Sequence, residues 1–264
     1  MLSRIDAVEV IAQDRDFRHD IELNVDAPQP ADFVAHAPRG AWYLPIKAIV
    51  EWAIAFILAV VFSPLLFVLA LLVKATSSGP AFYAQTRLGC NGRTYRIIKL
   101  RTMVQNAEAG TGPVWAAKDD CRITKIGQIL RATHLDELPQ LWNVLKGDMS
   151  LIGPRPERPE IAHRLERQIP GFRGRLLMKP GITGLAQMSL PADDPQDVDL
   201  KGVRRKLAHD LYYVREVNPL LDLRIAICTP CYFFAAAVDS VRRSLIRSYG
   251  VHAEKDFTTA HPTK

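Results

Sequence analysis

The sequence predicts a mostly helical protein with a small β element, attached to a membrane by an apolar helix. Three observations support this prediction. Residues 52–73 form a run of 22 residues without a charge. Apolar side chains recur at helical spacing in residues 126–133 and again in residues 138–145. Short runs rich in strand-forming residues flank a glycine-containing turn within residues 80–104.

The composition excludes several protein classes. The chain has 264 residues, of which 48% are hydrophobic and 23% are charged, so it is too apolar and too balanced to be disordered. Its length allows one good-sized domain, or a small domain with an appendage. Four cysteines without a regular framework do not suggest a disulfide-stapled secreted protein.

The apolar run is long enough to cross a bilayer, because 22 helical residues span roughly 33 Å. It begins after residue 50 and follows a polar stretch, which excludes a cleavable signal peptide. Ser63 and Pro64 lie near its middle, and proline bends a helix by removing a backbone donor. A straight span and a re-entrant hairpin are both compatible with this pattern. Basic residues on both flanks are what a hairpin with two cytoplasmic ends would show.

The net charge of +6 is concentrated in one stretch, and the rest of the chain is neutral overall. No acidic residue lies between Glu51 and Glu108. The six basic residues of this interval are Lys74, Arg87, Arg93, Arg96, Lys99 and Arg101. They could form a solvated basic face or a surface for anionic lipid, phosphate or nucleic acid.

Two adjacent carboxylates, Asp136 and Glu137, lie between the two helical patterns. Proline is tolerated only in a first helical turn, so Pro139 predicts that the second helix begins near Asp136. A helix N-terminus favours ionised carboxylates. Considered alone, the pair is explained more simply by an Asp N-cap with an acidic first turn.

The remaining segments are predicted from composition. Residues 225–238 are an uncharged run with a basic border, which indicates an interfacial helix or a core helix. Cys228 and Cys231 have metal or redox spacing, but one isolated pair favours a structural role. Residues 1–40 are expected to form a flexible or partly helical extension. The segments expected to lack regular structure are loops at 105–118 and 191–200, the irregular stretch 149–156 and a tight turn at 179–184.

Motif searches exclude a P-loop enzyme, a Rossmann dehydrogenase, a zincin and an α/β-hydrolase, since none of their signatures occurs. Arginine and lysine clusters suit phosphate, and carboxylates can hold Mg²⁺ or attack phosphorus. The residues alone therefore indicate phosphoryl chemistry at a membrane surface.

A series of short motifs occurs in one order along residues 42–248. After the Ser63–Pro64 break they read IKLRTM at 98–103, RIT at 122–124, Arg131, LDELPQL at 135–141, NVLKGDMS at 143–150, GPRPE at 153–157, KPGITG at 179–184 and DLYY at 210–213. In these motifs the chain resembles the bacterial sugar transferase family, the monotopic phosphoglycosyl transferases. Those enzymes move a sugar-1-phosphate from a nucleotide sugar onto a polyprenyl phosphate.

The resemblance implies a role for each matched residue. Asp136 would be the nucleophile that takes the sugar-phosphate as a covalent intermediate, and Glu137 would bind Mg²⁺, the implied cofactor. Lys99 matches a basic residue that the family needs for activity. The residues implied to bind substrate phosphate, nucleotide or lipid headgroup are Arg101, Arg131, Arg155 and Asp210.

The resemblance also implies the topology. The Ser63–Pro64 break would make the segment re-entrant, so that the protein enters only the cytoplasmic leaflet of the bacterial inner membrane. The expected fold is mostly α with a small β element, comprising a re-entrant helix hairpin, interfacial amphipathic helices and a compact cytoplasmic catalytic domain. The expected divisions are an extension at 1–41, the re-entrant helix at 42–78, the catalytic domain at 79–248 and a tail at 249–264.

The implied activity is the first membrane step of exopolysaccharide or O-antigen repeat-unit synthesis. The expected partners are UDP-glucose or UDP-galactose, undecaprenyl phosphate and membrane phospholipid. No nucleic-acid partner is expected, and a homodimer is one possible oligomeric state. The chain departs from the family pattern at Cys121, Leu185 and Met188–Ser189, and the last two departures adjoin a loop that could touch substrate and so bear on sugar specificity. The alternatives are a glycoprotein-pathway member using a modified amino sugar, or a non-catalytic adaptor that binds anionic lipid.

Overall fold

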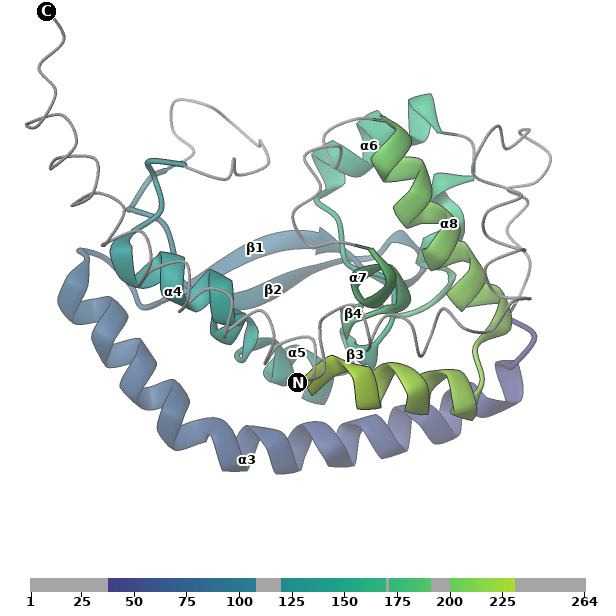
Figure 1. The fold of residues 1–264 in the computed structure, drawn as a ribbon, viewed down its shortest axis with the longest axis horizontal. Coiled ribbons are helices and arrows are strands. Elements are labelled where there is room, and N and C mark those ends of the chain that lie inside the picture. Colours follow the sequence, from purple (N-terminus) through teal and green to yellow (C-terminus); the bar gives the residue numbers. More distant parts are fainter. Residues whose placement is uncertain (1–37, 108–119, 170, 191–199, 231–264) are drawn as a thin grey trace, which may run out of the picture.

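A computed structural model describes residues 38–107, 120–169, 171–190 and 200–230. Within them the protein is mostly helical with two small sheets (Figure 1), as the sequence predicts. The elements are η2 (Ala41–Tyr43), α3 (Leu44–Thr76), β1 (Phe82–Leu88), η3 (Cys90–Gly92), β2 (Thr94–Leu100), α4 (Lys125–Thr133), η4 (Leu135–Glu137), α5 (Gln140–Leu145), β3 (Ser150–Ile152), α6 (Pro159–Gln168), η5 (Phe172–Leu177), β4 (Gly181–Thr183), α7 (Leu185–Ser189) and α8 (Leu200–Glu216). A further helix covers residues 219–230.

Several predicted segments lie outside the described residues. They are residues 1–37 of the extension, most of the loop at 105–118, most of the loop at 191–200, residues 231–238 of the last apolar run, Cys231 and the tail at 249–264.

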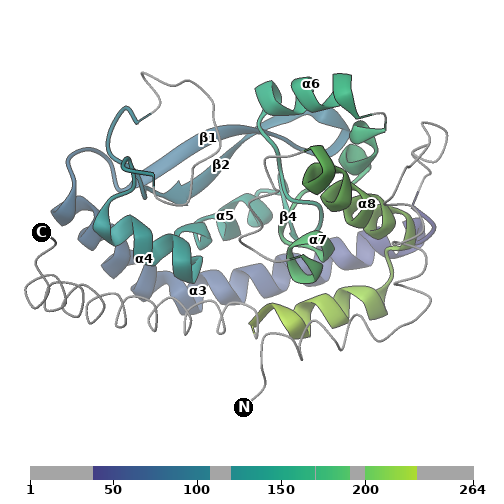
Figure 2. The same cartoon turned by 45° about the horizontal axis from the view of Figure 1, so that its top comes forward.

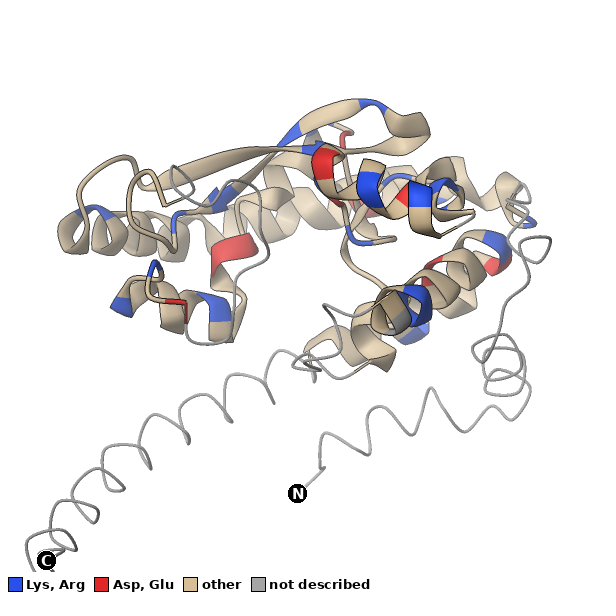
Figure 3. Cartoon of the chain, turned by 90° about the horizontal axis from the view of Figure 1, so that it is seen from above, with Lys and Arg blue, Asp and Glu red and all other residues tan. Residues whose placement is uncertain are grey.

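Helix α3 is the long helix that the apolar run predicts. Together with η2 it extends over Ala41–Thr76, and it is long and apolar enough to cross a membrane. The helix is continuous through Ser63 and Pro64, where the Ser63 hydroxyl donates to the Val60 carbonyl at 2.8 Å. Figure 1 shows one bowed helix whose concave side faces the rest of the molecule, and charged positions along it are few (Figure 3).

One stripe of α3 packs against the rest of the protein. Lys47, Glu51 and Ala55 are buried at four-residue spacing near its start, and Leu69 and Val73 are buried near its end. The other faces expose large apolar side chains, namely Ile46, Ile49, Val50, Trp52, Ile54, Phe56, Ile57, Val60, Val61, Phe62, Leu65, Phe67, Val68, Leu71 and Leu72. An apolar surface of this extent is typical of a membrane contact.

The start of α3 is held by three buried charges, here called the anchor cluster: Lys47, Glu51 and Asp222. Lys47 Nζ lies 2.7 Å from Glu51 and 2.6 Å from Asp222. Asp222, in the helix at 219–230, also accepts hydrogen bonds from the hydroxyls of Tyr43 and Tyr213, at 3.0 and 2.6 Å. The cluster therefore joins the first turns of α3 to a helix 175 positions further along the chain.

Glu51 connects α3 to strand β3 as well. Its carboxylate accepts a hydrogen bond from the backbone N–H of Ile152 at 3.0 Å and another from the Ser150 hydroxyl. The long helix is thus fixed to the strand that leads directly into the Gly153–Pro154–Arg155 segment.

Strands β1 and β2 form the predicted hairpin. They pair antiparallel with Tyr83 opposite Lys99 and Arg87 opposite Tyr95, and the connection runs through η3. Asn91 has a φ of 55° within that turn, a conformation that asparagine tolerates better than most residues. The small β element is confirmed.

Strands β3 and β4 form a parallel pair that the sequence analysis missed. They fall within stretches predicted as irregular (149–156) and as a tight turn (179–184), and both predictions are wrong in part. The pairing depends on close backbone contact, since a Cβ on Gly181 would lie 2.1 Å from the Gly153 nitrogen. Local composition shows the glycines but not that two distant segments meet.

The acidic pair does not begin an α-helix. Helix α4 ends at His134, which has a left-handed φ of 56°, and Asp136 and Glu137 then form the short 3₁₀ turn η4. Helix α5 begins only at Gln140, so the predicted helix start near Asp136 is wrong. Pro139 has no N–H with which to bond the carbonyl four residues back, which favours the tighter turn before it.

The last helix has two different sides. Ile225 is fully buried in a core that includes Tyr213 and Val217, whereas Leu223 and Ile227 are 56% and 62% exposed. Figures 1 and 2 show this helix beside α3, with α4 and α5 nearby. The core packing of Ile225 agrees with the core-helix alternative for the described part of this run, and the interfacial alternative stays a prediction.

Candidate active site

Glu137 lies at the centre of the candidate site and holds two cations from separate elements. Lys99 Nζ, from β2, lies 2.7 Å from Glu137 Oε1, and an Arg155 guanidinium nitrogen lies 2.7 Å from the same oxygen. The second Arg155 nitrogen is 3.4 Å from Oε2. With Asp136 these residues are here called the reactive cluster. The structure therefore brings together four of the residues that the sequence indicates.

The electrostatics of Glu137 follow from its two partners. Burial alone would raise the pKa of this carboxyl, but the charges and hydrogen bonds of Arg155 and Lys99 outweigh it and hold the pKa well below its usual range. Glu137 is therefore a permanent anion at physiological pH, and it keeps both cations beside Asp136.

Asp136 has a different environment. It is 7% exposed, and no described residue donates a hydrogen bond to its carboxylate. Burial, and secondarily the charge of Glu137, raises the pKa of Asp136 to about 6, against the opposing charges of Lys99 and Arg131. At neutral pH the Asp136 carboxylate is thus mostly ionised and accepts no hydrogen bond from a described residue. A carboxylate nucleophile requires such a state.

Arg131 lies near Asp136 in the last turn of α4. Its Nε donates to the Thr102 hydroxyl at 2.8 Å, and its charge acts on Asp136. Arg101 lies elsewhere, because β2 ends at Leu100 and the side chain turns to the α3–β1 connection. There it donates to the carbonyl and hydroxyl of Ser77 at 2.9 and 2.8 Å. Arg101 and Lys99 are two positions apart in the sequence, but in the structure Arg101 contacts Ser77 whereas Lys99 contacts Glu137.

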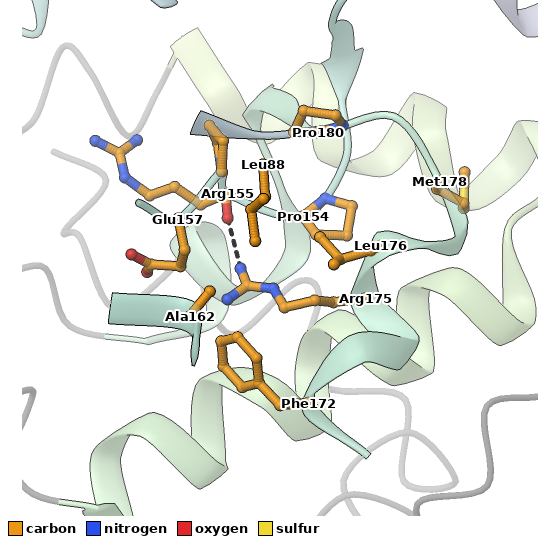
Figure 4. Close-up of a pocket in the computed structure, with 11 residues that line it drawn as sticks. Leu88, Pro154, Arg155, Glu157, Ala162, Phe172, Arg175, Leu176, Met178 and Pro180 are labelled. Atoms are coloured by element: carbon orange, nitrogen blue, oxygen red, sulfur yellow. Dashed lines mark hydrogen bonds between the residues drawn. The ribbon is translucent and has the colours of Figure 1, made fainter. Parts of the chain in front are cut away.

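Asp210 reaches the reactive cluster only through intermediaries. It is 2% exposed and lies 2.7 Å from Arg175, which donates to the backbone carbonyl of Arg155 at 2.5 Å. Figure 4 shows Arg175 extending toward this carbonyl, while the Arg155 side chain points away. The pocket between them is about 10 Å³, room for no more than one water. Asp210 and Arg175 therefore support the backbone that carries Arg155.

Arg175 is a residue that sequence reasoning missed. It is one of seven basic residues in 155–179, and nothing in that run sets it apart. In the structure its side chain is 8% exposed, whereas that of Arg173 is 72% exposed. The apolar residues Phe172, three positions before Arg175, and Leu176, directly after it, are the weak local signal that could have indicated burial.

The residues that depart from the family pattern are not at the site. Leu185 and Met188, on α7, are 1% and 4% exposed and pack in the core with Tyr213 and Val217. Cys121 is exposed, before α4. The two α7 positions therefore concern packing against α8 rather than direct contact with a sugar.

The donor set is compatible with a magnesium ion. Among the described residues no three His, Cys, Asp or Glu side chains converge, so this part of the chain would supply at most two carboxylates. Glu137 Oε2 has only the long contact to Arg155, which leaves a lone pair for a metal. Mg²⁺ is commonly held by one or two carboxylates together with substrate phosphates and water.

Comparisons with known proteins identify relatives for most of the chain. A family model described as bacterial sugar transferase matches residues 42–236. A UDP-N-acetylgalactosamine-undecaprenyl-phosphate N-acetylgalactosaminephosphotransferase of Aeromonas hydrophila is 40% identical over 193 residues, which cover 70% of this chain and 44% of the relative.

Two further relatives are more completely covered. A UDP-glucose:undecaprenyl-phosphate glucose-1-phosphate transferase of Caulobacter vibrioides is 40% identical over 183 residues, which cover 69% of this chain and 67% of the relative. An exopolysaccharide production protein of Rhizobium leguminosarum is 42% identical over 174 residues, covering 64% of this chain and 85% of the relative. The chain thus spans less than half of the Aeromonas relative and most of the other two.

Proposed function

The chain belongs to the bacterial sugar transferase family, and from this we propose that it transfers a hexose-1-phosphate from a UDP-sugar to undecaprenyl phosphate. The observation that supports it most is Asp136, a buried carboxylate that no described residue hydrogen-bonds, beside two cations held by Glu137. Relatives named as glucose and N-acetylgalactosamine phosphotransferases act on substrates of this class. The proposed sugar is glucose or galactose, for exopolysaccharide or O-antigen synthesis.

The reaction proceeds in two displacements at phosphorus. An Asp136 oxygen attacks the phosphorus that bears the sugar, the bond to the bridging oxygen breaks, and UMP leaves with that oxygen and its electron pair. An oxygen of undecaprenyl phosphate then attacks the same phosphorus of the acyl phosphate. The bond to Asp136 breaks, which restores the carboxylate and yields undecaprenyl-diphospho-sugar.

Charge on the phosphates is balanced by the residues around Asp136. Lys99 and Arg155 are placed to move from Glu137 to the diphosphate, Arg155 through paired hydrogen bonds and Lys99 as a point charge. When Mg²⁺ is bound, Glu137 would hold it and the ion would neutralise the leaving phosphate. Arg131 lowers the cost of keeping Asp136 ionised.

We also propose that α3 lies within one leaflet as a re-entrant segment rather than crossing the bilayer. Its buried stripe contacts the protein from Lys47 to Val73, so both ends lie on the side of the catalytic domain. A perpendicular span would carry that domain into the hydrocarbon. Exposed apolar side chains near α3 would enter the interface, namely Trp142, Ile129, Leu220, Leu223 and Ile227. The active site would then face the cytoplasm, where nucleotide sugars occur.

The covalent step is tested with purified protein and a nucleotide sugar labelled in the sugar, without lipid acceptor. We expect label to remain on the wild-type protein with release of UMP, and to transfer to undecaprenyl phosphate when that is added. Asp148→Asn serves as the matched control. Labelling of Asp136→Asn at the wild-type level would refute the nucleophile. A panel of UDP-glucose, UDP-galactose and UDP-N-acetylgalactosamine identifies the sugar.

The topology is tested by single cysteines at Ala41 and Ala75, which are exposed at the two ends of the helix, in a variant without the native cysteines. A re-entrant segment predicts that neither position reacts with an impermeant reagent added from the periplasm. Reaction at Ala41→Cys but not at Ala75→Cys would show that the helix crosses the membrane.

A further inference from the structure

We propose that one face of strand β1 is the nucleoside-binding wall of the active site, with Tyr83 as the surface on which the base stacks. The wall consists of Tyr83, Gln85 and Arg87. The inference rests on the proposed function, since its ligand is the nucleoside part of the nucleotide sugar and of the UMP that leaves.

Strand geometry places this wall at the reactive cluster. Successive side chains point to opposite faces, so Tyr83, Gln85 and Arg87 share one face. Tyr83 lies directly opposite Lys99 in the hairpin register, and Lys99 Nζ lies 2.7 Å from Glu137. Opposed side chains on one face have Cβ atoms about 4.5–5.5 Å apart. Tyr83 is therefore the cross-strand neighbour of the lysine that faces the reacting phosphates.

The other end of the wall meets the loop that carries Arg155. Arg87 donates to the Pro156 carbonyl at 3.0 Å and lies 3.9 Å from the Glu157 carboxylate. The four-residue separation of Tyr83 and Arg87 corresponds to roughly 14 Å of strand. A nucleoside diphosphate laid along this face would have phosphate-binding cations, Lys99 and Arg155, within reach.

The wall is ordered before any ligand binds. Arg87 donates to the Gln85 side-chain oxygen at 2.6 Å, and the Gln85 amide donates to the Tyr83 hydroxyl at 3.2 Å. These two hydrogen bonds orient the Tyr83 side chain, and Tyr83 remains 43% exposed. A ring that is already held loses little freedom on binding, and a π-face accepts a stacked base.

The test uses the full chain in lipid nanodiscs, with UMP binding by calorimetry and steady-state kinetics with the UDP-sugar. We expect Tyr83→Ala to weaken UMP binding and to raise KM roughly tenfold. The change in kcat should be smaller than the change in KM. Tyr83→Phe keeps the ring and should retain most of the affinity. The matched control is Phe82→Ala, because Phe82 is 46% exposed on the opposite face of the same strand.

The outcomes separate this inference from the proposed function. One outcome is that the wild-type protein releases UMP from its UDP-sugar while Tyr83→Ala and Phe82→Ala have equal KM and equal UMP affinity. That result would refute the nucleoside-binding wall and leave the proposed function standing. A wild-type protein that releases no nucleotide from any sugar donor refutes the proposed function, and the wall falls with it. A selective loss in Tyr83→Ala, retained in Tyr83→Phe, supports the wall.

Discussion

The anchor cluster and the reactive cluster use similar charges to different ends. Each places a lysine against a carboxylate in a buried setting, at 2.7 Å between Lys47 and Glu51 and at 2.7 Å between Lys99 and Glu137. In the anchor cluster every carboxylate oxygen has a hydrogen-bond partner. In the reactive cluster the cations converge on one carboxylate, and its neighbour Asp136 has no hydrogen bond from a described residue.

This difference separates structural charges from chemical ones. Fully paired buried charges fix geometry, and they destabilise the fold when one partner is removed. An ionised carboxylate held next to cations, but without hydrogen bonds from them, retains its lone pairs for reaction. Completeness of pairing, rather than the presence of charge, is therefore what distinguishes the two clusters.

The largest expected effect comes from removing the unpaired carboxylate. Asp136→Asn should lower the rate of sugar-phosphate transfer by at least about 10³-fold, because the proposed nucleophile is lost. UMP release and product formation measure it. An Asp136→Asn protein that keeps more than a tenth of the wild-type rate would remove the distinction between the clusters.

Replacing Lys47 should mainly lower stability, whereas replacing Lys99 should mainly lower activity. Lys47→Met leaves Glu51 and Asp222 buried with fewer partners, so we expect the free energy of unfolding to fall by about 3–5 kcal/mol. Lys99→Met should cost less stability, because its side chain is 20% exposed and Glu137 keeps Arg155 as a partner, but it should abolish most activity. Unfolding in mild detergent and activity at low temperature separate the effects. Equal stability losses in both variants would contradict the comparison.

Asp210→Asn tests the support behind the reactive cluster. The change keeps the size of the side chain but removes the charge that holds Arg175, which in turn holds the Arg155 backbone. We expect kcat to fall between about tenfold and 100-fold through misplacement of Arg155. A purely structural role would lower the midpoint of unfolding without this kinetic loss, and Arg173→Ala at the exposed neighbour is the control.

The smallest effects concern pH. The pKa of Asp136 is raised to about 6, so its contribution to stability is complete below the unfolded pKa and is lost as pH rises through about 6. Asp136→Asn should therefore be more stable than wild type at pH 8, with the gain vanishing near pH 4. Thermal unfolding across this range measures the gain. Covalent labelling of the wild type should increase with pH through about 6.

Glu137 should show the opposite sign. Its pKa is depressed, so it stabilises the fold above its unfolded pKa and loses that contribution as pH falls. Glu137→Gln is expected to be less stable than wild type at pH 7, with the deficit shrinking as the solution is acidified. Parallel pH profiles for the two variants would show that the neighbouring carboxylates are equivalent.

Local pattern was enough to predict the elements whose cause is local. The uncharged run predicts α3, alternation with a glycine turn predicts the β1–β2 hairpin, and the adjacent carboxylates with their lysine indicate the site. The β3–β4 pair was missed because it requires segments about thirty residues apart to meet at glycines.

Pairing of charges was also beyond the sequence. Lys47 and Asp222 lie 175 positions apart, and Arg175 and Asp210 lie 35 positions apart. Arg175 and Arg173 read alike in sequence, and only packing makes one buried and the other exposed. Which charges become structural is therefore a property of the tertiary fold.

The buried stripe of α3 has a consequence for how the protein is made. Ala55 is fully buried among Ile97, Leu141 and Val144, so the membrane helix supplies part of the interior of the catalytic unit. A shortened gene starting after residue 78 would therefore give an aggregating product rather than a soluble enzyme. During synthesis, the interior can close only once this helix has docked, which couples maturation of the enzyme to its arrival at the lipid surface.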